Sequence, residues 1–112
     1  MSSRLRSDIT VAALVRRVSA AGGHAAVLAK GESEAGAILL ECADRGRTTA
    51  ILERLLDADL RYRWQRVGPD MSESTAVRDY LARRRARDPD LWIVELDIPD
   101  ATRFADESDT AG

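Results

Sequence analysis

Cysteine and histidine are nearly absent from this chain, which contains only Cys42 and His24. One cysteine cannot form an intrachain disulfide, and one cysteine with one histidine cannot supply the ligands of a structural zinc site. Long apolar runs are also lacking. The longest stretch without a charged residue extends from Val18 to Ala29, well short of the ~20 apolar residues that a membrane-spanning helix needs. These absences exclude a disulfide-rich secreted scaffold, a Cys/His zinc module and a helical membrane protein.

A strong charge of either sign is missing as well. The 17 basic and 19 acidic residues give a formal net charge of −2. This balance excludes a histone-like polycation that binds nucleic acid through bulk charge. Arginines interrupt the first apolar segment, so we expect no signal-peptide core. The sequence therefore predicts a soluble cytoplasmic protein without a membrane partner, a metal or a cofactor.

The chain has 112 residues, of which 45% are apolar. That length and composition are typical of one domain with one hydrophobic core. We predict a single globular domain over residues 1–97 and an acidic, partly disordered tail over residues 98–112. From Asp97 onward, five acidic residues stand against the single basic residue Arg103, a composition that favours disorder.

Two segments have helical periodicity. The first runs from Asp8 to Ala21, with Ser7 as its predicted N-cap and Gly22-Gly23 as its stop. Its apolar residues recur at the i, i+3, i+4, i+7 spacing of an amphipathic helix: Val11, Leu14, Val15 and Val18. The second is predicted to be capped by Asp70, or alternatively by Ser72, and to end near Arg87 before Pro89.

Short apolar segments between glycines and turn residues predict the strands. Ala25–Lys30 and Ala37–Cys42 are expected to form a hairpin around the loop Gly31–Gly36. Thr48–Leu56 fits strand or helix, and strand is preferred because Leu60–Gln65 after it alternates cleanly. Leu91–Leu96 reads as a final strand.

The predicted fold class is therefore α+β, a single domain with an antiparallel β-meander of about five strands and two helices. The element order is α-β-β-β-β-α-β. A small open sheet leaves edges that a second copy can cover, so a homo-oligomer is a hypothesis.

Arginines gather at two places that are candidates for binding a partner. Four lie within five residues at the end of the second predicted helix: Arg83, Arg84, Arg85 and Arg87. Arg61 and Arg63 share one face of a predicted strand, and Arg66 follows it. These residues suit phosphates or an acidic partner. The alternative is structural, because cations stabilise a helix C-terminus and solvated strand faces are commonly charged.

Carboxylates are the remaining candidates for chemistry. Asp88 and Asp90 flank Pro89 and lie near Glu95, and such a cluster could serve a metal or acid–base catalysis. A turn between helix and strand explains the first two better. A nucleophilic pair of Cys42 with His24 is considered and not favoured, because Cys42 lies in an apolar strand.

Several segments resemble an uncharacterised bacterial family, domain of unknown function 1491. Similar segments are Arg4-Leu5, Asp8-Ile9, Val11, Ala13-Leu14, Arg16-Arg17, Ala35-Gly36-Ala37-Ile38-Leu39, Trp64, Phe104 and Asp106-Glu107. The most specific is Asp88-Pro89-Asp90-Leu91-Trp92-Ile93-Val94-Glu95. The resemblance spans Arg4 to Glu107 and implies a short bacterial cytosolic protein. It implies no activity, ligand or catalytic residue.

The function itself is not evident from these residues. The leading hypothesis is a non-enzymatic protein-interaction or accessory module, because no set of residues meets the needs of catalysis and the charged clusters suit a partner. The alternative is a phosphate- or nucleic-acid-binding module that uses the arginine-rich faces. A small enzyme built on Asp88, Asp90 and Glu95 is the third.

Overall fold

The computed structural model describes residues 6–111, and the side chains of residues 6–106. These residues form three helices and five strands. In chain order they are α1 (Ser7–Ala20), β1 (His24–Ala29), β2 (Ile38–Asp44), β3 (Arg47–Leu56), β4 (Tyr62–Val67), α2 (Ser74–Arg87), β5 (Trp92–Asp97) and α3 (Thr102–Ala111). The α+β class and the predicted strand at residues 48–56 are confirmed. No helix among the described residues is long and apolar enough to cross a membrane.

The sheet is mixed, with the strand order β1-β5-β2-β3-β4. Strands β2, β3 and β4 form the expected antiparallel meander, whereas β5 lies between β1 and β2, parallel to β2 and antiparallel to β1. The predicted hairpin of the first two strands is therefore wrong. Strand β5 can occupy an interior position of the sheet because most of its residues on both faces are apolar and buried, as in interior parallel strands.

The loop between β1 and β2 passes over the start of β5, and its glycines make this possible. A Cβ added to Gly31 would lie 2.2 Å from the carbonyl oxygen of Asp90, and one added to Gly36 would lie 2.4 Å from the same oxygen. Both glycines are thus required by close backbone packing rather than by a hairpin turn.

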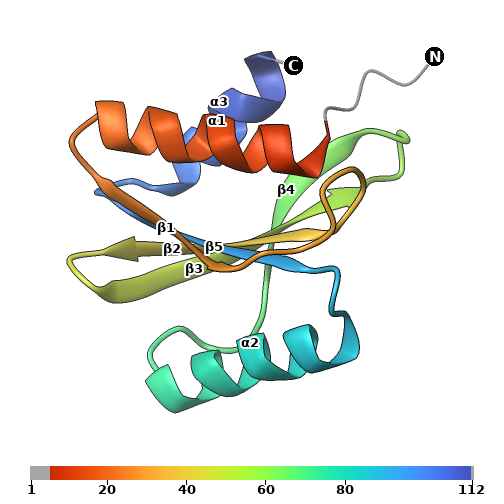
Figure 1. Ribbon diagram of the computed structural model, residues 1–112. Helices are drawn as coiled ribbons and strands as arrows, with labels where there is room; N and C mark the ends of the chain where they lie inside the picture. Colours follow the sequence, from red (N-terminus) through yellow and green to blue (C-terminus); the bar gives the residue numbers. More distant parts are fainter. Residues whose placement is uncertain (1–5, 112) are drawn as a thin grey trace.

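Helices cover both faces of the sheet, as Figure 1 shows: α1 and α3 lie above it and α2 lies below. The larger core lies under α1 and α3. Helix α1, the sheet and the C-terminal segment all contribute to it. Its members include Val11, Leu14 and Val18 of α1, Leu40, Ala50, Trp64, Trp92 and Leu96 of the sheet, and Ala101 and Ala105 of the C-terminal segment. A smaller cluster lies between the sheet and α2 and contains Leu39, Ile51, Val77, Leu91 and Ile93.

Helix α1 begins one residue earlier than expected, and Ser7 is not its N-cap. The Ser7 hydroxyl is buried and donates a 2.6 Å hydrogen bond to the carbonyl of Gly36. The free N–H groups of Ser7 and Asp8 instead donate to the carbonyls of Glu34 and Ser33. The loop backbone therefore caps the helix. At the other end Gly22 has a φ of +91°, so the left-handed stop is confirmed.

Helix α2 begins at Ser74, later than either predicted cap allows. Its N-cap position is Glu73, which makes no side-chain capping bond. The carboxylate of Asp70 instead accepts the N–H of Ser72 and holds the preceding turn. Asp70 therefore holds a turn before the helix and is not its N-cap.

The globular domain does not end at residue 97. Ile98, Ala101 and Ala105 are buried in the larger core, and residues 102–111 form α3. Part of the predicted acidic tail is therefore a helix packed above the sheet. Its apolar positions are sparse but fall on one side, and this is the signal that net charge concealed.

Candidate functional site

The arginines at the end of α2 divide into two pairs. Arg84 makes a bidentate ion pair with Glu53 of β3, at 2.9 and 2.8 Å, and also donates to the hydroxyl of Tyr80. Arg85 donates to the carbonyls of Lys30 and Leu91. Both side chains are half-buried and attach α2 to the sheet, whereas Arg83 and Arg87 are exposed. Only the second pair is available to a partner.

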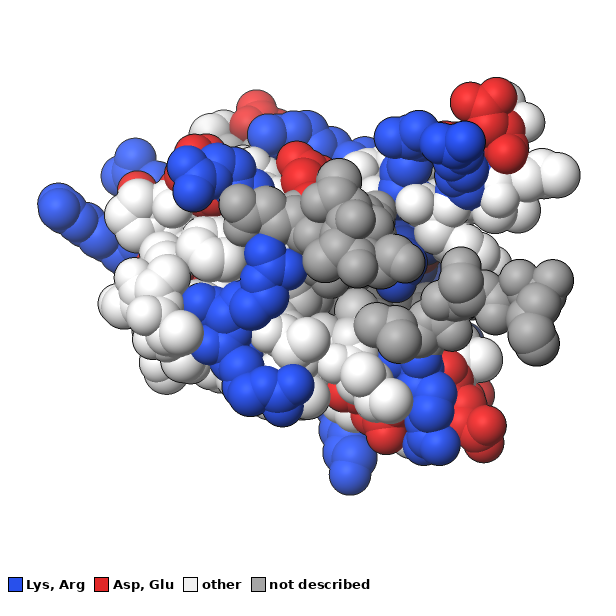
Figure 2. Space-filling model, turned by 90° about the horizontal axis from the view of Figure 1, so that it is seen from above, with Lys and Arg blue, Asp and Glu red and all other residues white. Residues whose placement is uncertain are grey.

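The other predicted arginines do not join them. Arg63 forms an ion pair with Asp57 within its own hairpin, and Arg61 is exposed in the turn before β4. Arg66 pairs in register with Leu52, whose side chain lies in the core on the α1/α3 face. The sheet therefore separates Arg66 from α2. Figure 2, which views the α1/α3 face, shows basic side chains in several separate groups, some of them beside acidic side chains. The predicted arginines form no common surface.

The segment Asp88–Trp92 is a structural joint. The Asp88 carboxylate accepts the N–H of Asp90, and the Asp88 carbonyl accepts the N–H of Leu91. The carbonyl of Asp90 in turn accepts the N–H of Glu32. This turn therefore connects the end of α2 and the start of β5 to the loop between β1 and β2 (residues 30–37), which we call the crossing loop. Turn chemistry predicts such a role for Asp88-Pro89-Asp90.

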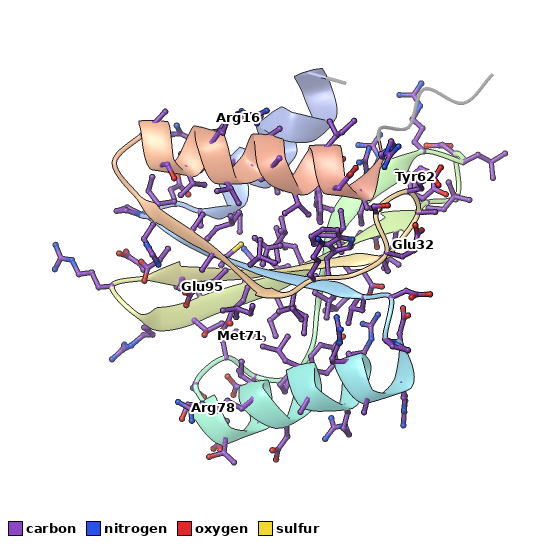
Figure 3. All side chains as sticks on the ribbon, viewed as in Figure 1. Arg16, Glu32, Tyr62, Met71, Arg78 and Glu95 are labelled. Atoms are coloured by element: carbon purple, nitrogen blue, oxygen red, sulfur yellow. The ribbon has the colours of Figure 1, made fainter. Side chains whose placement is uncertain are left out.

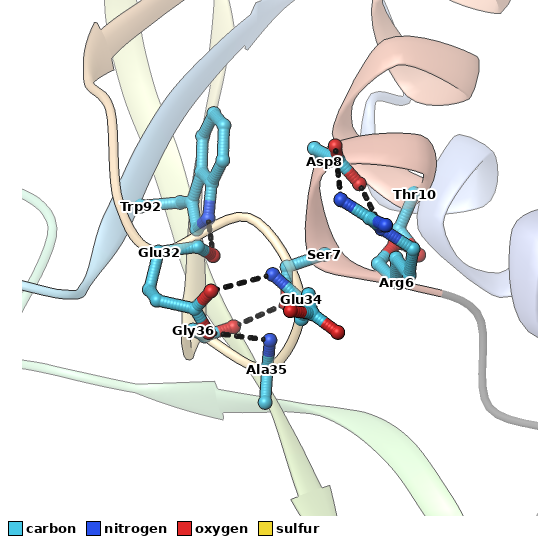
Figure 4. Close-up of polar contacts among 9 residues, drawn as sticks. All are labelled: Arg6, Ser7, Asp8, Thr10, Glu32, Glu34, Ala35, Gly36 and Trp92. Atoms are coloured by element: carbon cyan, nitrogen blue, oxygen red, sulfur yellow. Dashed lines mark hydrogen bonds and ion pairs between the residues drawn. The ribbon is translucent and has the colours of Figure 1, made fainter.

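Hydrogen bonds also hold the crossing loop, both to Trp92 and within the loop itself (Figure 4). The indole N–H of Trp92 donates to the carbonyl of Glu32 at 2.8 Å. The Glu32 carboxylate accepts the N–H groups of Glu34 and Ala35, which lower the pKa of that carboxyl. These bonds occupy the loop's own donors, so the loop supports the fold rather than a ligand.

The carboxylates considered for catalysis lie apart. Asp88 and Asp90 hold the turn before β5, whereas Glu95 lies within that strand, and no group of three or more His, Cys, Asp or Glu among the described residues could hold a metal. Cys42 is fully buried, and burial raises the pKa of its thiol to about 12. His24 is exposed at the start of β1. Neither set of residues has the arrangement that its proposed chemistry needs.

Glu95 instead has a neighbour that sequence reasoning missed. It pairs in register with Glu41 on the adjacent parallel strand β2, so the two side chains lie side by side on the face toward α2. The hydroxyl of Thr48 donates to Glu41 at 2.6 Å. Among the described residues the carboxylate of Glu95 has no hydrogen-bond partner, although its backbone pairs within the sheet. Two like charges are thus held next to each other, which is unfavourable for the free protein.

The two glutamates line a half-open cleft of about 720 Å³ between the sheet and the N-terminal half of α2. Figure 3 shows Glu95 beneath the sheet, with Met71 and Arg78 below it on the α2 side. The apolar lining consists of Leu28, Met71, Val77 and Leu81, and the polar lining consists of Glu41, Glu95, Arg47, Thr48, Ser72, Ser74 and Arg78. We call this the carboxylate cleft. Its volume is that of an ordinary ligand pocket.

The electrostatics of the cleft are acidic around Glu95. Partial burial raises the pKa of that carboxyl, and the charges of Glu41 and Asp97 raise it further, against a smaller opposing effect of His24. Asp97 itself accepts the N–H groups of Arg45 and Gly46 and holds the β2–β3 turn. A cation beside Glu41 and Glu95 would relieve this repulsion.

A sequence signal for the pair does exist. Glu41 is the one charged residue inside the apolar segment Ile38–Ala43, and Glu95 is the one charged residue inside Leu91–Leu96. A lone glutamate in a strand buried on both faces is costly unless it faces a cleft or a partner. The sequence did not reveal that the two strands are neighbours.

The comparisons with known proteins agree with this fold. Residues 5–106 match the family model described as a protein of unknown function, DUF1491. The chain belongs to the DUF1491 family. The resemblance seen in the sequence is thus confirmed, and a function remains unassigned for the family. No curated protein matches the chain.

Three solved structures of similar proteins share the architecture. A crystal structure of a DUF1491 family protein from Caulobacter crescentus has 32% identity and a TM-score of 0.80, over 90% of this chain and 94% of that one. An NMR structure of a family member from the same organism has 31% identity and a TM-score of 0.79, over 93% and 94%. The solution structure of Atu0922 from A. tumefaciens has 33% identity and a TM-score of 0.66, over 85% and 86%.

Proposed function

We propose that this DUF1491 protein is a non-enzymatic interaction module of the bacterial cytoplasm, and that the carboxylate cleft binds a basic, partly apolar segment of a partner protein. The observation that carries the proposal is the placement of Glu41 beside Glu95 in a cleft with apolar walls. A guanidinium or ammonium group would neutralise the two carboxylates, and neighbouring apolar side chains would pack on Leu28, Val77 and Leu81.

The cleft suits a polypeptide segment better than an enclosed small molecule. It is open on one side, where β1 is the edge strand and Leu28 is 54% exposed. A segment can therefore enter the cleft from this side and lie between the sheet and α2. Alternating basic and apolar side chains would then meet alternating carboxylate and apolar positions.

The arginines at the end of α2 offer less surface for an acidic partner than the sequence predicted. Arg84 and Arg85 are occupied by contacts within the chain, which leaves Arg83 and Arg87 at the end of α2. Binding of phosphates or nucleic acid through the arginine-rich faces stays a competing hypothesis. It predicts steep salt dependence and an effect of R83E/R87E, neither of which requires Glu95.

Synthetic peptides test the proposal directly. A 12-residue peptide of alternating leucine and arginine should bind the ¹⁵N-labelled protein and shift the amide signals of Glu41, Glu95 and Val77. A matched peptide with glutamine for arginine should bind about tenfold more weakly, since removing a charge-assisted pair costs about 1.4 kcal/mol. Raising the salt concentration should weaken only the first peptide.

Variants of the protein supply the second arm. The double variant E41Q/E95Q should lose the preference for the arginine peptide. The control D59N/D79N removes the same charge from two exposed aspartates outside the cleft and should keep that preference. An arginine preference that E41Q/E95Q retains, equal binding of the two peptides to the native chain, or amide shifts confined to α2 near Arg83 would overturn the proposal.

A further inference from the structure

The two edges of the sheet differ in the features that keep edge strands from pairing. Strand β4 forms one edge and carries Arg63, Gln65 and Arg66, with Arg61 just before it. Strand β1 forms the other edge and has no charged residue between His24 and Lys30. Charged side chains are a common protection of edge strands against pairing. By this criterion β4 is protected and β1 is not.

Strand β1 also exposes apolar side chains. Val27 is 45% exposed and Leu28 is 54% exposed, although both belong to a strand of the sheet. A β-bulge interrupts the pairing of β1 with β5 between Val27 and Ala29. The bulge places Leu28 in the lining of the carboxylate cleft while Val27 remains opposite Val94 on the α1 side. Exposed apolar residues on both faces are what an added strand would bury.

We propose that β1 pairs antiparallel with the β1 strand of a second copy of this chain, about a two-fold axis at Val27. Over its central residues, Ala26, Val27 and Leu28, the strand is complementary to itself in this register. Val27 meets its own counterpart on the α1 side, and Leu28 of each copy lies opposite Ala26 of the other on the cleft side. The small alanine accommodates the larger leucine, and His24 and Lys30 fall at the solvated ends.

The second copy also contributes to the carboxylate cleft. Ala26 pairs in register with Glu95, so the face of β1 that carries Ala26 is the face that carries the glutamates. Leu28 of the second copy, placed opposite Ala26, extends the apolar wall of the cleft at its open side. The dimer would therefore hold two clefts, each completed by a residue of the other copy, around one closed interface.

The interface is small, because one strand from each copy forms it. Interfaces of that size associate weakly, so the dimer should form in a concentration-dependent way. Light scattering coupled to size exclusion should give a mass that rises from the monomer toward the dimer as the native chain is concentrated. A monomer mass at every concentration up to that of an NMR sample would overturn the proposal.

Matched lysine substitutions locate the interface. V27K places a charge at the edge of β1 and should give a monomer at every concentration. L60K makes the same change at a residue that is 77% exposed in the β3–β4 turn, and should associate like the native chain. Both positions are exposed, so both variants should keep the native circular dichroism spectrum. Association that L60K abolishes and V27K leaves intact would contradict the proposal.

Cross-linking tests the register. The single native cysteine, Cys42, is buried, so an engineered cysteine reports alone. V27C should form an intermolecular disulfide on mild oxidation at concentrations that favour the dimer. A26C, displaced by one residue from the axis, should cross-link at least fivefold less. Preferential cross-linking of A26C would overturn the proposed register. The preference for the arginine peptide rests on Glu41 and Glu95 of a single chain, so a monomeric V27K should keep that preference, and the two proposals are tested separately.

Discussion

The face of the sheet covered by α1 and α3 and the face covered by α2 bury their residues by different means. Above the sheet, fully buried apolar side chains such as Leu14, Leu40 and Leu96 form a continuous core. Below it, apolar packing covers only one end, and polar contacts of Arg84 and Arg85 complete the attachment of α2. The other end of that face is the carboxylate cleft. The larger core and the proposed recognition site thus lie on opposite faces of the sheet.

This division explains why charged residues can occupy the lower face at all. A dry core on both sides would leave no solvent for Glu41 and Glu95, and ionised carboxylates without partners are costly there. Because α2 covers the sheet incompletely, the two glutamates keep access to water. Because the cover is incomplete, the attachment of α2 depends in part on a few polar contacts. We therefore expect the amides of α2 to exchange their hydrogens faster than those of α1.

The largest effect should come from matched leucine truncations on the two faces. Leu14 of α1 is fully buried, whereas Leu81 of α2 is half-buried at the cleft. L14A should lower the free energy of unfolding by about 3 kcal/mol, because it leaves a cavity in the core. L81A should lower it by no more than about 1 kcal/mol, since solvent can fill the space. Urea denaturation measures both. Equal losses would show that the two faces contribute alike.

A smaller effect should follow from detaching α2. R84A removes the bidentate contact with Glu53 and leaves a half-buried carboxylate unpaired, so it should cost about 1.5 kcal/mol. The control R83A removes an exposed neighbour and should change stability by less than about 0.5 kcal/mol. Hydrogen exchange should also accelerate in α2 of R84A and not in α1. Uniform acceleration throughout the chain would contradict a separate role for this contact.

Local patterns predicted the elements well and their neighbours poorly. The periodicity of Val11, Leu14 and Val18 identified α1, and alternation before Gln65 identified the β3–β4 hairpin. The insertion of β5 depends on the close approach of Gly31 and Gly36 to one carbonyl of Asp90, far away in sequence. No local pattern encodes that contact.

The candidate site was missed for the same physical reason. Glu41 and Glu95 are neighbours only because β5 lies beside β2, so an antiparallel meander could not bring them together. The arginines were found because they cluster in sequence, yet Arg84 and Arg85 serve the fold. A cluster in sequence therefore indicated a helix end, and two isolated residues in apolar strands formed the cleft.

The smallest effect concerns the cost of the glutamate pair. Burial and neighbouring negative charge raise the pKa of Glu95 in the folded state, so ionisation of this carboxyl is less favourable there than in the unfolded chain. Below the pKa that Glu95 has in the unfolded chain, the carboxyl is protonated in both states and does not lower the free energy of unfolding. As the pH rises through the pKa of the folded state, ionisation of Glu95 lowers the free energy of unfolding. E95Q, which cannot ionise, should therefore be more stable than the native chain at pH 7 by about 0.5 kcal/mol.

The pH dependence separates this charge effect from a packing effect. The difference between E95Q and the native chain should shrink as the pH falls through the ordinary glutamate pKa of about 4.3, and vanish by about pH 3, where the native carboxyl is protonated in both states. The control E34Q, at an exposed glutamate of the crossing loop, should show no such gain. Urea midpoints at several pH values measure both variants. A gain from E95Q that persists at low pH would show that the amide packs better, and the repulsion from Glu41 would then have no part in it.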